Sequence, residues 1–183
     1  MIDYGPFRFA AAPRTGSTWF LNAMNTVGFQ GGSKATVHIP HKDEKCPTLR
    51  VSLVRHPCDW LRSYFTAIYP GNCGIPEVDT LLSIKADDFD TFINGYLWQH
   101  EGQVGRIFKA YHADSYIRTQ DILYGTIDLL ISVGVPLNKW DFLSPAPVNA
   151  SVGPKHLLPR WKPHLRQLVC KKEEELMENF NFT

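Results

Sequence analysis

Short apolar runs alternate with segments of helical spacing along this chain. The first apolar run, residues 7–12, leads directly into the turn-forming residues 13–18. Residues 19–27 then carry apolar side chains at helical spacing, and Gly28 stands just past their end. The amino-terminal segment therefore predicts a buried strand, a loop and a helix.

The next part of the chain repeats this order. Residues 35–39 are a candidate for a second short strand. Residues 49–54 form an almost continuous apolar, β-branched run, which is typical of a strand buried in a parallel sheet. Pro57 follows at a position suited to the first turn of a helix, and Asp59 lies where the helix dipole favours a negative charge. We expect this helix to extend to about Tyr69.

Three further helices and one strand are expected in the second half of the chain. The helices are one capped by Asp87 or Asp88 and running through Trp98, one capped by Asp121 and ended by Gly134, and one over residues 165–180. Residues 116–118 are a weak candidate for a strand. Residues 141–163 contain five prolines and are expected to be irregular. The charged run at residues 171–175 is expected to face solvent.

Alternation of strands and helices predicts an α/β fold. We expect three layers, with a parallel sheet flanked by helices as in P-loop NTPases, in a single domain over residues 1–183. In such sheets ligands bind at the carboxyl ends of the strands. The search for a functional site therefore starts at those ends.

Composition narrows the range of functions. Hydrophobic residues make up 44% of the 183 residues and charged residues 20%, so the chain can bury a core. The formal net charge of +1 argues against nucleic acid as a partner. The start of the chain does not resemble a signal peptide, and the best apolar run, residues 127–137, is too short for a bilayer. We expect a cytoplasmic protein without membrane insertion.

The four cysteines are not spaced as a zinc knuckle or a C-x-x-C motif. They are Cys46, Cys58, Cys73 and Cys170. Reduced and mostly buried thiols are the simplest expectation. A bridge between Cys58 and Cys73 is the alternative.

Residues 11–18 nearly match the Walker A pattern. Gly16 and Thr18 align with its second glycine and its hydroxyl, while Ser17 stands in place of the lysine. Arg14 supplies a positive charge one turn earlier. A strand–loop–helix junction directs backbone N–H groups at an anion. Without the lysine, the loop suits a phosphosulfate better than a nucleoside triphosphate. An ordinary tight turn is the alternative.

Residues 13–19, Pro-Arg-Thr-Gly-Ser-Thr-Trp, resemble the 5′-phosphosulfate loop of sulfotransferases that use 3′-phosphoadenosine 5′-phosphosulfate (PAPS). The resemblance implies that the phosphosulfate is held by Arg14, Thr15, Gly16, Ser17 and Thr18. It also implies that Trp19 lies against the adenine. A place in the core of the protein is the alternative for Trp19.

A second segment, residues 51–64, is similar to the 3′-phosphate motif of the same family. Arg55 ends a predicted strand, and Ser63 follows eight residues later within the predicted helix. The resemblance implies that both grip the 3′-phosphate. Independently, an arginine at the carboxyl end of a parallel strand points into the ligand crevice, and its planar fork matches a phosphate. A salt bridge for Arg55 and a routine helix position for Ser63 are the alternatives.

Weaker similarity extends further along the chain. Residues 116–123 resemble a strand end of the family, but Thr119 stands where a tyrosine is usual. Residues 149–151 resemble a late Asn-x-Ser segment. The glycine-rich basic motif that closes over the 3′-phosphate is absent as such, and residues 153–155 or 160–162 are candidates to replace it.

Transfer of a sulfuryl group to an alcohol needs a base for the hydroxyl proton, and histidine suits that task. The segment Val-His-Ile-Pro at residues 37–40 resembles a Thr-His-x-Pro element whose histidine is the family's base, which implies His38. His41, Asp43 and Glu44 are rivals. A zinc site at His38, His41 and Cys46 would lack further ligands at suitable spacing.

The predicted activity is transfer of the PAPS sulfuryl group to a hydroxyl acceptor, a carbohydrate or a small metabolite. Arg14 and His38 would be catalytic, adenosine 3′,5′-bisphosphate would be the product, and no metal is required. The alternatives are a P-loop nucleotide or small-molecule kinase and a non-catalytic nucleotide-binding protein. A kinase is disfavoured because the lysine is missing and because an arginine, not an aspartate, follows residues 49–54.

Overall fold

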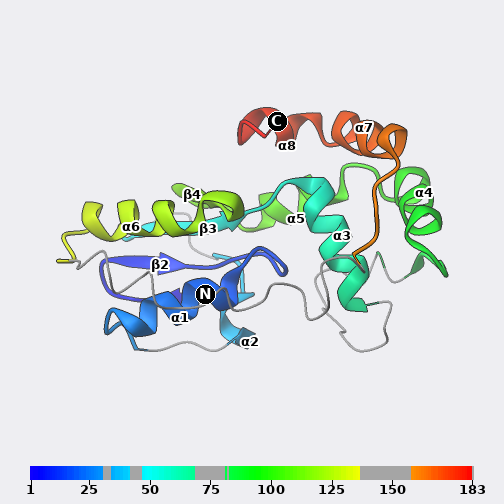
Figure 1. Cartoon of the computed structure of the whole chain (residues 1–183). Helices are drawn as coiled ribbons and strands as arrows, with labels where there is room; N and C mark the ends of the chain where they lie inside the picture. The colour runs from blue at the N-terminus through cyan, green and yellow to red at the C-terminus, as the bar shows by residue number, and fades with distance from the viewer. Residues whose placement is uncertain (31–33, 42–46, 69–80, 82, 137–157, 183) are drawn as a thin grey trace. The chain divides into compact units, whose positions relative to one another are not determined.

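The structure is a computed structural model that describes residues 1–30, 34–41, 47–68, 81, 83–136 and 158–182. The chain divides into two compact units, each built from two segments (Figure 1). The first unit contains Met1–Arg55 and Ala110–Ala150, and the second contains His56–Lys109 and Ser151–Thr183. A single domain over residues 1–183 stays a prediction.

A four-stranded sheet forms the centre of the first unit. Its strands lie in the order β1 (Ile2–Asp3), β2 (Phe7–Phe9), β3 (Leu49–Val54) and β4 (Ser115–Arg118). The last three are parallel, as predicted, whereas β1 was not expected and is antiparallel to β2. Gly5 has a φ of 88° between β1 and β2, and such a tight connection can join only antiparallel strands.

One face of this sheet packs against two helices, α1 (Ser17–Thr26) and α6 (Ile122–Ser132). Alternate strand positions supply its apolar side chains, which are Phe7, Phe9, Val51, Leu53 and Ile117. Phe9 stacks on Phe20 of α1 with 3.9 Å between the ring centroids. The predicted α/β class is therefore confirmed at the level of a mixed sheet flanked by helices.

The strand predicted at residues 35–39 was wrong, because this segment contains the short helix α2 (Lys34–Val37). Among the described residues, one backbone hydrogen bond joins it to the segment after β2, from the Ala11 N–H to the Val37 carbonyl at 3.0 Å. The Ile39 N–H turns back to the Thr36 carbonyl. The Ile39 hydrogen bond is therefore local, as in a helical turn, and does not belong to a β-ladder.

The second unit is helical around an aromatic core. Its helices are α3 (Pro57–Ile68), α4 (Phe89–Gln99), α5 (Gln103–Ala110), α7 (Pro163–Lys172) and α8 (Glu174–Asn179). Ala110, the last residue of α5, is assigned to the first unit. Helices α3, α4 and α7 pack against one another. Trp60 stacks on Tyr64 and Tyr64 on Phe92, with centroid distances of 5.2 and 6.1 Å. Helix α5 was not predicted.

Helix ends agree with the sequence in some places and not in others. Asp88 caps α4, as predicted, by accepting a hydrogen bond from the Thr91 N–H at 2.8 Å. Asp121 precedes α6 but does not cap it, because its carboxylate pairs with Arg118 at 2.7 Å. The helix predicted over residues 165–180 is divided into α7 and α8 at Glu173.

Glu173 is buried, with 3% of its surface exposed, although the charged run around it was predicted to face solvent. It accepts hydrogen bonds from the Tyr96 hydroxyl, from the Val104 N–H at 3.1 Å and from the Gly105 N–H at 2.8 Å. Burial raises the pKa of the Glu173 carboxyl. The prediction failed because the spacing of residues along a helix does not reveal that one charged side chain forms buried hydrogen bonds with other helices.

None of the described helices combines the length and apolar character needed to cross a membrane. This finding covers only the part of the chain that the structure describes.

Candidate anion-binding site

The loop after β2 has the backbone of an anion-binding turn. Arg14 and Gly16 both have positive φ, at 67° and 95°. Helix α1 begins at Ser17, and its first turn contains no acidic residue and no side-chain cap among the described residues. Backbone N–H groups at the start of a helix can bind an anion, so this loop is a candidate anion site.

Glycine is required at position 16 for two reasons. Its φ of 95° lies in the left-handed region, which other residues rarely adopt. A Cβ there would also approach the Ile122 Cδ1 to 3.1 Å and the Thr119 Cγ2 to 3.5 Å. The loop is therefore packed closely on the start of α6.

The hydroxyl groups of the loop have different environments. Thr15 is fully buried, and its hydroxyl donates to the Ala12 carbonyl at 2.6 Å. This internal bond shapes the loop, and the predicted donation from Thr15 to an anion would require breaking it. Ser17 is also buried, whereas Thr18 is partly exposed. Trp19 is partly buried and packs against the core of the first unit.

Arg55 brings the two predicted phosphate motifs together. It follows β3 directly, and its Nη1 donates to the Arg14 carbonyl at 2.9 Å. The guanidinium of the second motif thus contacts the backbone of the first. The loop 13–18 itself contains no acidic residue. Two arginines and the amino end of α1 therefore contribute positive charge at this edge of the sheet.

Thr119 ties the same edge to β4, which it follows directly. Its hydroxyl lies 2.7 Å from the Thr15 carbonyl and 3.0 Å from the Val54 carbonyl. The loop after β2, the end of β3 and the end of β4 consequently meet at one place. These are the carboxyl ends of the three parallel strands, where α/β sheets bind ligands.

His38 lies beside the start of the anion-binding loop. Its Nδ1 is 2.7 Å from the Ala11 carbonyl. Because a carbonyl only accepts, Nδ1 carries the proton, and Nε2 of the neutral ring keeps a lone pair. The Tyr111 hydroxyl donates to the His38 carbonyl at 2.8 Å. The hydrogen bond at Nδ1 thus fixes the tautomer of the ring, and Nε2 is the nitrogen that could accept a proton.

The rival bases are less well placed or are not described. His41 Nδ1 lies 3.2 Å from the Met1 sulfur, and burial lowers the pKa of His41. Asp43 and Glu44 lie outside the described residues, as do Cys46 and Cys73. Ser63 is partly buried in α3 of the second unit. Its link to Arg55 rests on the spacing in the sequence.

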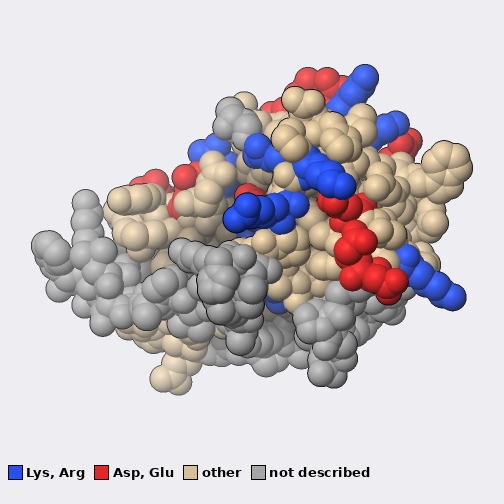
Figure 2. Space-filling model, turned by 45° about the vertical axis from the view of Figure 1, so that its right-hand side comes forward, with Lys and Arg blue, Asp and Glu red and all other residues tan. Residues whose placement is uncertain are grey.

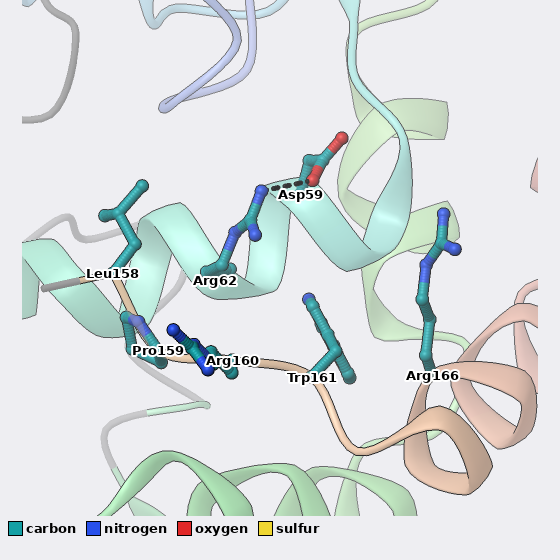
Figure 3. Close-up of a pocket in the computed structure, with 7 residues that line it drawn as sticks. All are labelled: Asp59, Arg62, Leu158, Pro159, Arg160, Trp161 and Arg166. Carbon is teal, nitrogen blue, oxygen red and sulfur yellow. Dashed lines mark hydrogen bonds and ion pairs between the residues drawn. The ribbon is translucent and has the colours of Figure 1, made fainter. Parts of the chain in front are cut away.

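The second unit has a pocket of about 500 Å³ beside α3 (Figure 3). Its lining is Asp59, Arg62, Leu158, Pro159, Arg160, Trp161 and Arg166. Arg62 pairs with Asp59 at 2.8 Å. Part of the segment 160–162, one of the two candidates for the missing basic motif, thus lines a pocket that contains three arginines. Segments 149–151 and 153–155 lie outside the described residues.

Charges of both signs lie on one face of the described residues. On the face shown in Figure 2, lysine and arginine side chains gather next to a group of aspartates and glutamates. Lys162 and Asp90 form one such pair at 2.7 Å.

Two positioning residues of this site were missed in the sequence. Thr119 was noted only as a departure from a family pattern, although a hydroxyl directly after a parallel strand is a usable signal. Tyr111 gave no signal, because its role depends on a contact with the backbone of a residue far away in the sequence.

No protein-family model matches this chain, and no curated protein or solved structure matches it significantly. An assignment of function therefore rests on the residues and geometry described above.

Proposed function

We propose that this protein binds PAPS at the carboxyl edge of the sheet and transfers its sulfuryl group to a hydroxyl acceptor. One observation carries the proposal, namely the hydrogen bond from Arg55 to the Arg14 carbonyl. Two short motifs that are separate in the sequence would each be weak evidence. Their contact in the first unit supports one site with two anion-binding parts. The P-loop-like character of the fold belongs to the same proposal.

Each part of the cofactor has a proposed partner. The backbone N–H groups of residues 15–18 and the Arg14 guanidinium bind the 5′-phosphosulfate. Arg55 binds the 3′-phosphate, and the resemblance of residues 51–64 to the 3′-phosphate motif is the basis for proposing Ser63 as a second ligand. Trp19, which is partly buried, contacts the adenine.

The proposed reaction is an in-line displacement at sulfur. The acceptor oxygen forms a bond to sulfur while the bond from sulfur to the 5′-phosphate oxygen breaks, and adenosine 3′,5′-bisphosphate leaves. Nε2 of His38 takes the hydroxyl proton, since Nδ1 already carries one. Arg14 and the amino end of α1 stabilise the charge on the leaving phosphate. The positive charge in this scheme comes from side chains, so it requires no metal.

A kinase is a weaker candidate for this site. Ser17 stands where the Walker lysine would contact the β- and γ-phosphates. Arg55 occupies the position after β3 where a magnesium-binding aspartate would be needed. The acceptor is proposed to be a carbohydrate or small metabolite, and a cytoplasmic location stays a prediction.

Binding tests the cofactor assignment. Adenosine 3′,5′-bisphosphate should raise the melting temperature more than adenosine 5′-monophosphate, or ATP with magnesium, at equal concentration. Arg55→Ala should weaken binding of the bisphosphate roughly 10- to 150-fold, because a charged hydrogen bond contributes about 1.5–3 kcal/mol. Arg106→Ala, an exposed arginine of α5, is the matched control and should bind normally.

The same titrations can contradict the proposal. Equal binding of the bisphosphate and the monophosphate would exclude a 3′-phosphate site. A screen of hydroxyl acceptors with PAPS labelled in its sulfuryl group then separates an enzyme from a non-catalytic binder, because only the enzyme transfers label.

A further inference from the structure

A group of three potential metal ligands lies in the second unit, and the proposed function does not use it. His56 precedes α3, Cys58 lies in its first turn and Cys170 lies in α7. Each offers one ligand atom, and the three atoms lie within 4.8 Å of one another. Two thiols and an imidazole form a typical ligand set for zinc.

His56 has a buried nitrogen that the fold does not satisfy. The side chain is 6% exposed, and its Nε2 has no hydrogen-bond partner among the described residues. The Cys58 N–H donates to Nδ1 at a long 3.2 Å. Buried polar atoms are nearly always bonded, so an orphan nitrogen calls for an explanation.

The spacing of the two sulfur atoms matches a shared metal better than a covalent bond. The Sγ atoms of Cys58 and Cys170 are 3.6 Å apart. Two thiolates on a tetrahedral zinc, each at about 2.3 Å, lie roughly 3.8 Å from each other. A disulfide would need about 2.05 Å. Cys58 and Cys170 are both free thiols, and Cys73, the alternative bridge partner of Cys58, lies outside the described residues.

We propose that His56, Cys58 and Cys170 bind a zinc-like divalent cation, with water in a fourth position. As the two sulfur–metal bonds form, each thiol releases its proton to solvent. The metal would join the start of α3 to α7, two helices that already pack against each other. The proposal does not depend on nucleotide binding or sulfuryl transfer.

Cobalt is the probe that reports on ligand type. The full chain, reduced with a phosphine and stripped of metal, is titrated with Co²⁺. We expect one equivalent to produce the thiolate-to-cobalt charge-transfer absorption and the visible bands of tetrahedral cobalt, and Zn²⁺ to displace both. Cys58→Ser, Cys170→Ser and His56→Gln should each weaken binding by roughly 100-fold or more, beyond the 10- to 100-fold typical of an outer-shell partner.

The other two cysteines provide a matched control. The double variant Cys46→Ser, Cys73→Ser removes two of the four thiols and keeps Cys58 and Cys170. It should bind cobalt like the unmodified chain. Far-ultraviolet circular dichroism checks that each variant is folded. Should a ligand variant fail to fold, X-ray absorption of the unmodified zinc-loaded chain still decides, because it should show two sulfur ligands and one nitrogen.

Other results would overturn the metal site. Cobalt spectra without thiolate bands, or unchanged cobalt affinity and band intensity in both Cys58→Ser and Cys170→Ser, would exclude these ligands. Formation of a Cys58–Cys170 disulfide by mass spectrometry, together with no metal binding in the reduced chain, would instead assign the pair to redox chemistry. Binding of adenosine 3′,5′-bisphosphate is measured separately, so failure here leaves the proposed function untouched.

Discussion

Two helix starts in this protein show the same physical problem with different solutions. At the start of α5, the Val104 and Gly105 N–H groups donate to the buried carboxyl of Glu173. The first turn of α1 contains no acidic residue, and Arg14 precedes it. The first N–H groups of a helix have no partner within the helix, and together with the helix dipole they attract a negative charge. The Glu173 carboxyl is the acceptor at the start of α5, and we propose that a bound anionic ligand is the acceptor at the start of α1.

Glycine has a matching role in each of these helix starts. A Cβ at Gly105 would lie 3.1 Å from the Glu173 Oε2, and a Cβ at Gly16 would lie 3.1 Å from the Ile122 Cδ1. Both glycines allow a close approach. The neighbour is an internal acceptor in the first case and an apolar side chain in the second. The comparison therefore predicts that changes near α5 affect stability, whereas changes near α1 affect binding and turnover.

The largest expected effect is on turnover, at His38. His38→Ala should lower the rate of sulfuryl transfer by roughly 100- to 10,000-fold, the range for loss of a general base. Affinity for adenosine 3′,5′-bisphosphate and the free energy of unfolding should change little. His164→Ala, an exposed histidine of α7, is the control for initial-rate measurements. Near-normal turnover in His38→Ala, with loss in His41→Ala or Glu44→Ala, would assign the base elsewhere.

The start of α5 should give the largest effect on stability. Glu173→Ala removes the acceptor of two backbone N–H groups and of the Tyr96 hydroxyl, and leaves them buried. We expect a loss of about 2–4 kcal/mol in the free energy of unfolding, measured with urea. Glu174→Ala, its exposed neighbour, should change this value by less than about 0.5 kcal/mol.

Nucleotide affinity per folded molecule should be the same in both variants. If Glu173→Ala unfolded no more easily than Glu174→Ala, the hydrogen bonds of Glu173 to the start of α5 would not stabilise the fold.

Local patterns predicted the elements around the proposed site well. The strand at residues 49–54 and the helix that starts at Pro57 have the predicted starts, because an apolar β-branched run and a proline at a first turn act within a few residues. The parallel order of β2, β3 and β4 followed from the alternation with helices. This placed Arg14 and Arg55 at one edge before any contact was known.

Features that depend on distant partners could not be predicted in this way. Glu173 looks like an exposed charge in the sequence, and only the packing of α5 against it explains its burial. Asp121 has the pattern of a helix cap, but Arg118 competes for its carboxylate. Cys58 and Cys170 are far apart in the sequence, and no spacing rule pairs them.

The smallest expected effect tests a charge that serves the fold of the first unit. Arg50 of β3 is buried, and the Asp114 carboxylate accepts from its backbone N–H at 2.9 Å, its Nε at 3.0 Å and its Nη2 at 2.6 Å. Hydrogen bonds from Arg50 lower the pKa of Asp114 from 3.8 to about 2. Since the folded pKa is the lower one, this stabilisation is complete above the unfolded value and is lost as the pH falls toward 2.

Asp114→Asn should therefore reduce the free energy of unfolding by about 1 kcal/mol at pH 6, a value discounted because the Asp114 side chain is 41% exposed. The difference from the unmodified chain should shrink between pH 4 and pH 2, where the unmodified carboxylate also becomes protonated. Urea titrations across this range measure it, with the exposed Asp128→Asn as control. If the difference in the free energy of unfolding stayed constant down to pH 2, the stabilising effect of the Arg50–Asp114 pair would not depend on the negative charge of Asp114. Unchanged binding of adenosine 3′,5′-bisphosphate in Asp114→Asn would further separate Arg50, at the amino end of β3, from Arg55, which follows its carboxyl end.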